Sequence, residues 1–88
     1  MYAVEFTKSA SKDLKKLPDY IRQRVETALT SLRLDPFSDL IRYRKVKGHD
    51  SLYRIRLGDY RVVYEIKAEK LLILIIRVWH RGDVYRGI

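Results

Sequence analysis

Alternating apolar and polar residues between Ser51 and Glu65 constrain the fold more than any other feature of this chain. Apolar side chains recur at every second position in both halves of the segment, as in a strand with one buried face. The two halves meet at Gly58-Asp59, and a glycine in the first position of a two-residue loop is typical of a type II′ hairpin turn. The sequence therefore predicts a β-hairpin that turns at these two residues.

A two-residue turn also determines which side chains share a face of the hairpin. Arg56 then lies directly opposite Arg61, and Arg54 projects from the same side. Like charges in this arrangement destabilise a sheet by about 0.2–1 kcal/mol per pair. Two interpretations stay open: a solvated basic surface relieved in part by Glu65, or a preformed site for phosphate, which guanidinium groups bind bidentately.

Composition limits the class of partner. The 88 residues are enough for one small domain spanning residues 1–88, and 47% of them are hydrophobic, so the chain should fold. Nineteen Lys and Arg residues against eleven Asp and Glu give a formal charge of +8. Such an excess points to nucleic acid, an acidic protein or a membrane surface. No cysteine is present, which excludes disulfides and thiolate metal sites.

We expect this chain to lack a signal for secretion or membrane insertion. Glu5 interrupts the start of the chain, where a signal peptide needs an apolar region. The longest apolar run, Leu71 to Ile76, is six residues long and too short to cross a bilayer. We therefore expect a soluble, cytoplasmic protein.

The remaining patterns predict an α+β fold of order β-α-α-β-β-β-β, with two helices from the N-terminal half on one face of a small, twisted, antiparallel-rich sheet. Ser9 is the expected N-cap of the first helix, and Pro18 is expected to open the second at its first position. The helices should cover the apolar side of the hairpin and leave the arginine side open. The expected elements are a strand over 2–7, helices over 8–17 and 19–34, a short strand over 41–46, the hairpin, and an internal strand over 71–78.

The segment H-R-G-D-V-Y, residues 80–85, follows the last predicted strand and contains an imidazole, a guanidinium and a phenol. RNA cleavage by an adjacent 2′-hydroxyl needs a base, stabilisation of the charged phosphorane and an acid. Arginines supply the charge stabilisation, and Tyr85 or His80 can move protons. The structural alternatives are a packing tyrosine at 85 and, at 80, a strand-end histidine bonded to backbone.

The face on which His80 lies depends on the loop before the last strand. A loop of two or four residues near Lys67 to Lys70 places His80 on the arginine side, and a loop of three places it on the other. The other histidine, His49, is far away in sequence and has no acidic pair nearby, so no metal site is expected. No cofactor-binding motif occurs either.

With these features in view, the chain resembles the RelE family of the RelE/ParE toxin superfamily. The resemblance rests on F-T-K-S-A-x-K-D-L-x-K-L near the start, L-Y-R-I-R-L-G-D-Y-R-V-V-Y in the hairpin and H-R-G-D-V-Y near the end. It implies a metal-independent endoribonuclease that cleaves mRNA in the ribosomal A site.

By position, the resemblance assigns Arg54 and Arg56 to the basic pair before the turn and Arg61 to the transition-state arginine. It assigns Arg81 to the general acid or charge stabiliser, and Tyr85 to the general base. Well-known bacterial members of the family have lysines at the first two positions. Arginine holds phosphate equally well but hardly gives up a proton.

The resemblance also implies a partner, namely an antitoxin that holds the toxin inactive in a hetero-oligomer. An acidic, amphipathic segment that folds on binding would suit a chain of charge +8. Two alternatives are a ParE-like toxin that acts on DNA gyrase without cleaving RNA, and a degenerate toxin that serves only in autoregulation with its antitoxin.

Overall fold

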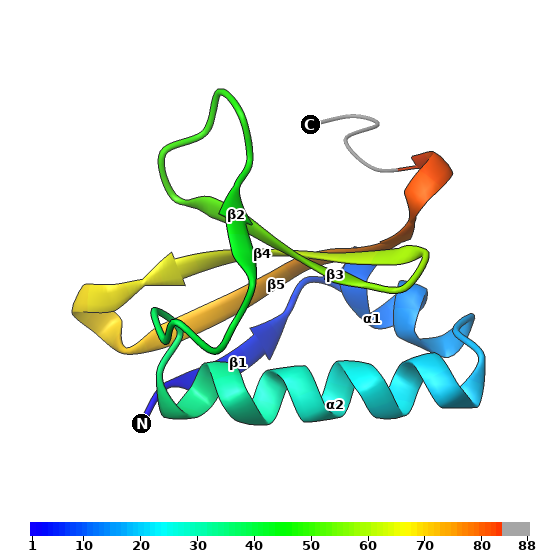
Figure 1. The fold of residues 1–88 in the computed structure, drawn as a ribbon, viewed down its shortest axis with the longest axis horizontal. Coiled ribbons are helices and arrows are strands. Elements are labelled where there is room, and N and C mark those ends of the chain that lie inside the picture. The colour runs from blue at the N-terminus through cyan, green and yellow to red at the C-terminus, as the bar shows by residue number, and fades with distance from the viewer. Residues whose placement is uncertain (84–88) are drawn as a thin grey trace.

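The computed structural model describes residues 1–83 and shows an α+β fold in which two helices lie on one face of a five-stranded sheet (Figure 1). The predicted fold class is confirmed. The elements are β1 (Ala3–Phe6), α1 (Lys8–Lys15), α2 (Asp19–Leu34), β2 (Tyr43–Lys45), β3 (Leu52–Leu57), β4 (Tyr60–Lys67), the 3₁₀ turn η1 (Ala68–Lys70), β5 (Leu72–His80) and the 3₁₀ turn η2 (Arg81–Asp83).

The sheet has the order β1-β5-β4-β3-β2, with only the β1–β5 pair parallel. The strand expected over residues 71–78 is β5, which lies inside the sheet between β1 and β4 and extends to His80. Its apolar run is explained by this internal position, because both faces of the strand are largely covered.

Two details of the helix starts differ from expectation. The N-cap of α1 is Thr7, whose hydroxyl accepts a hydrogen bond from the Ala10 backbone N–H at 3.0 Å, and the prediction of Ser9 was wrong. Thr7 was taken as the end of the first strand, which hid its capping role. Pro18 was expected at the first helical position of α2, but it occupies the N-cap position and the helix begins at Asp19.

The main core lies between the helices and the sheet. Ile21, Val25, Leu29 and Leu32 form the buried stripe of α2, at the spacing that the sequence predicted. They pack with buried residues of the sheet, and each fully buried side chain of this size contributes about 1.5–3 kcal/mol. The sheet residues of this core are Ile55, Leu57, Val62, Tyr64, Ile66, Ile73, Ile75 and Val78.

A second, smaller core lies on the opposite face of the sheet. Val46, Val63 and Trp79 are buried there, with Leu52 and Ile76 packed against them. This cluster explains why the face that carries the arginines is not polar throughout. Neither helix within residues 1–83 has the length and apolar character that crossing a membrane requires.

Helix α1 completes the edge of β5 beyond the point where β1 ends. The Thr7 hydroxyl donates to the Ile76 carbonyl oxygen at 2.7 Å. The Asp13 carboxylate accepts from the Val78 backbone N–H at 2.9 Å and from the Arg77 guanidinium at 2.8 and 3.0 Å. These bonds fix the end of β5, from which the predicted tail motif emerges.

Candidate nucleic-acid interface

The β3–β4 hairpin has the register that the sequence predicted. Arg56 pairs with Arg61 and Arg54 with Val63, so Arg54, Arg56 and Arg61 lie on one side. Gly58 has φ +61°, and no non-glycine residue of the turn has a positive φ, as a type II′ turn requires.

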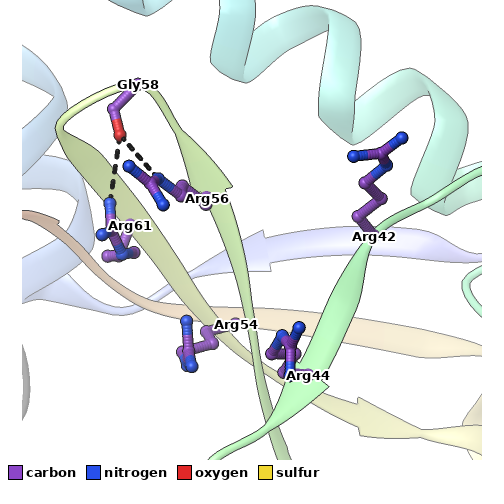
Figure 2. A pocket seen from close by; sticks show the side chains of 6 residues that line it. All are labelled: Arg42, Arg44, Arg54, Arg56, Gly58 and Arg61. Atoms are coloured by element: carbon purple, nitrogen blue, oxygen red, sulfur yellow. Dashed lines mark hydrogen bonds between the residues drawn. The ribbon is translucent and has the colours of Figure 1, made fainter.

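Arg44 of β2, and Arg42 just before this strand, add two arginines to this face. A groove of about 610 Å³ is lined by Arg42, Arg44, Arg54, Arg56, Gly58 and Arg61 (Figure 2). Arg44 pairs directly with Arg54 across β2 and β3, which makes a second pair of facing like charges. The predicted strand over residues 41–46 included both Arg42 and Arg44, but their distance from the hairpin in sequence hid their place in the groove.

Within the groove, two guanidinium groups meet at one backbone oxygen. Arg56 Nε donates to the Gly58 carbonyl oxygen at 3.3 Å, and Arg61 Nη1 donates to the same oxygen at 3.1 Å (Figure 2). The described residues that line the groove include no carboxylate. The arrangement concentrates positive charge and presents planar N–H donors, which is the chemistry that binds phosphate oxygens.

Arg81 lies next to the hairpin turn at the end of β5. Its backbone N–H donates to the Asp59 carbonyl oxygen at 2.6 Å, and its Nε lies 4.0 Å from Asp59 Oδ1. Figure 1 shows η2 and the hairpin turn at the same end of the sheet. The fold therefore brings Arg81 close to the turn that carries Arg56 and Arg61, although its side chain is not part of the groove lining.

His80 lies on the face opposite the arginines. The loop between the paired residues Lys67 and Leu72 has four residues, which alone would place His80 on the arginine side. However, Tyr64 pairs with Ile75 and Val63 with Arg77, so one extra residue in β5 forms a β-bulge and reverses the alternation.

The side chain of His80 consequently contacts residues on the helix side of the sheet. Its ring packs edge-on against Tyr60, with 5.3 Å between ring centroids. Its Nδ1 accepts a weak hydrogen bond from the Gly82 backbone N–H at 3.4 Å. These contacts match the structural alternative of a strand-end histidine bonded to backbone.

Tyr85, the other predicted proton-transfer residue, lies outside the described residues. Within residues 1–83, no three His, Asp or Glu side chains gather in a way that could hold a metal ion. Tyr64 has a clearly shifted pKa, but it lies in the main core, far from this chemistry. Burial, together with the nearby phenols of Tyr43 and Tyr53, raises the pKa of Tyr64 above its usual range.

Comparison with known proteins agrees with this geometry. The family model described as ParE toxin of type II toxin-antitoxin system, parDE, matches residues 4–85. Toxin RelE3 of Methanocaldococcus jannaschii is 36% identical, with 93% of each chain covered. The mRNA interferase toxin RelE of Escherichia coli is 30% identical, covering 96% of this chain and 90% of that toxin.

Solved structures lead to the same family. A chain of the RelB-RelE antitoxin-toxin complex from Methanococcus jannaschii superposes with a TM-score of 0.79 at 32% identity, covering 96% of this chain and 98% of that one. This chain belongs to the RelE/ParE toxin family of type II toxin–antitoxin systems.

Proposed function

We propose that this toxin is an endoribonuclease that cleaves mRNA in the ribosomal A site by attack of a 2′-hydroxyl on the adjacent phosphate. The observation that carries the proposal is the groove in which arginines from three strands gather. Repulsion between facing arginines costs stability, and a polyanionic ligand in the groove offsets that cost. The relative named as an mRNA interferase in Escherichia coli supports the same reaction.

In the proposed mechanism, the arginines hold the phosphate and stabilise its developing charge. Arg54 and Arg56 bind the phosphates of the RNA strand, and Arg61 stabilises the phosphorane. Arg81 approaches from the end of β5 and stabilises charge on the departing 5′-oxygen. As proposed, these guanidiniums supply the electrostatic stabilisation and the reaction uses no metal ion.

Proton transfer then requires a group other than arginine, because a guanidinium is almost never deprotonated in a protein. His80 lies on the opposite face of the sheet from the groove and packs against Tyr60. We therefore assign the role of general base to Tyr85, whose phenol can act in this way.

We propose that the toxin binds an antitoxin through an acidic, amphipathic segment of that partner. The two chains form an inactive hetero-oligomer in the cytoplasm. A similar structure from Methanococcus jannaschii is a RelB-RelE antitoxin-toxin complex. The arginine groove offers this segment a cationic surface, so an acidic segment bound there would compete with RNA.

Cleavage of a defined mRNA in a translating extract tests the proposal. Arg61→Ala and Arg81→Ala should each reduce the cleavage rate by about 100-fold or more, the loss typical of removing one transition-state donor. Arg33→Ala removes the same charge from the far end of α2 and should cleave like the wild type. Cleavage at the wild-type rate by both active-site variants would refute the assignment.

A second candidate is a toxin that acts on DNA gyrase and cleaves no RNA, because the family model that matches residues 4–85 is named for ParE. Purified protein would then inhibit supercoiling by gyrase while leaving ribosome-bound mRNA intact. We expect the reverse result, with mRNA cut and supercoiling unaffected.

A further inference from the structure

Arg24, an exposed residue of α2, lies at the tip of the hairpin. Its Nη1 is 3.1 Å from the position that a Cβ atom on Gly58 would occupy. On the other side of the turn, Arg56 and Arg61 donate to the carbonyl oxygen of the same glycine. Guanidinium groups from α2, β3 and β4 therefore meet around a single residue without a side chain.

Arg24 also lines a cavity of about 340 Å³ between α2 and the hairpin turn, together with Tyr20, the turn residues 58–60 and His80. A neighbouring cavity of about 410 Å³ shares Tyr20 and Arg24 and continues along α2 towards Leu57. Gly58 lines both the first cavity and the arginine groove. The two sites are thus separated only by the tip of the hairpin.

The groups in this second site suit a nucleotide. Tyr20 is 65% exposed, so its ring is open to stacking by a base. Arg24 is exposed and forms no ion pair within the part of the chain that the structure describes. The nearby carboxylate of Asp59 has the Arg81 guanidinium beside it.

We propose that the cavity between α2 and the hairpin tip is a second RNA subsite, in which Arg24 binds a phosphate and Tyr20 stacks on a base. The single strand that fills the arginine groove continues over Gly58 into this cavity. The inference rests on the proposed function, since it extends the path of the same substrate. An acidic protein segment would pair with Arg24 but has no need of an open aromatic ring, which favours RNA as the ligand.

Binding of oligoribonucleotides methylated at every 2′-oxygen tests the proposal without cleavage. In a series of increasing length, wild-type affinity should rise as the strand fills the arginine groove. It should rise a second time once the strand is long enough to pass the hairpin tip. Arg24→Ala should bind the short oligonucleotides normally and the long ones about five- to tenfold more weakly, with a salt slope reduced by about 0.7. Tyr20→Ala should also weaken only the long ones, and Tyr20→Phe should retain their affinity.

Arg33→Ala is the matched control, because it removes the same charge from the same helix roughly 13 Å along the axis. Equal losses for Arg24→Ala and Arg33→Ala, or a loss that does not depend on length, would overturn the proposal. So would a loss of affinity for an acidic peptide with RNA binding unchanged, since this result would assign Arg24 to a protein partner.

The two proposals fail in different ways. Length-dependent binding through Arg24 in a protein that does not cleave mRNA would refute the nuclease and leave the subsite standing. If Arg24→Ala cleaves mRNA at the wild-type rate and binds long strands normally, the subsite is refuted. The proposal that the protein is a nuclease is then unaffected.

Discussion

Arg56 and Arg61 face each other across β3 and β4 and both donate to the carbonyl oxygen of Gly58. A shared acceptor holds the two guanidinium groups close together, and a carbonyl oxygen carries no net charge. The pair is therefore better suited to binding an anion than to stabilising the hairpin.

Replacing one member of this pair should stabilise the free protein and weaken RNA binding. We expect Arg56→Gln to raise the free energy of unfolding by about 0.2–1 kcal/mol at low salt, since it removes a facing like charge. Urea denaturation followed by the fluorescence of Trp79, the sole tryptophan, measures this change. Added salt should reduce the difference by screening the wild-type repulsion.

Lys45→Gln is the control for that experiment. Lys45 lies in β2 opposite Tyr53, so its removal relieves no facing charge. A similar gain in stability for both variants would show that lower net charge, rather than the Arg56–Arg61 pair, is responsible.

The contact between α1 and β5 should be a major source of stability. Asp13 is only 13% exposed and binds both the Arg77 guanidinium and the Val78 backbone N–H. We expect Asp13→Ala to lower the free energy of unfolding by about 2–4 kcal/mol, because it removes partly buried charge-assisted bonds. Asp19→Ala, which removes an exposed ion pair with Arg22, should cost less than about 0.5 kcal/mol in the same denaturation experiment.

The buried phenol of Tyr64 should make stability fall at alkaline pH. Its hydroxyl has no hydrogen-bond partner among the described residues, and burial raises its pKa above the usual value. Because the raised pKa belongs to the folded state, its stabilising contribution is complete below about pH 10, the pKa of an unfolded tyrosine. That contribution is lost as the pH rises towards the folded-state pKa.

Tyr64→Phe should remove this part of the pH dependence and match or exceed wild-type stability at neutral pH. The reason is that an unpaired buried hydroxyl costs about 1–3 kcal/mol. Thermal unfolding of both proteins between neutral and alkaline pH checks the prediction. A loss of more than about 1 kcal/mol in Tyr64→Phe at neutral pH would contradict it, since this would mean that the hydroxyl has a partner.

Substitutions at His80 distinguish a structural role from proton transfer. We expect His80→Asn, whose side-chain oxygen can still accept from the Gly82 N–H, to cleave mRNA within a few-fold of wild type. Tyr85→Phe should lose about 100-fold or more, as removal of a general base does. If the cleavage rate of His80→Asn falls by a similar factor, and its pH–rate profile also lacks one limb of the wild-type profile, then His80 is the base and Tyr85 is not.

Local patterns in the sequence determined much of this protein. The alternation in the hairpin and the glycine at its turn specify the register, and therefore the common face of Arg54, Arg56 and Arg61. The helical spacing in residues 19–34 likewise specifies the buried stripe of α2. These features depend on backbone periodicity and turn geometry, which neighbouring residues control.

Only the tertiary structure decided the rest. The β-bulge in β5 moves His80 away from the arginines, and no local signal marks it, because it depends on how β5 fits β4 on one side and β1 and α1 on the other. Arg24 reaches the hairpin tip because α2 packs across the sheet and Gly58 leaves room for its guanidinium. Contacts between segments far apart in the chain depend on how those segments pack together. The pattern of residues within one segment does not determine that packing.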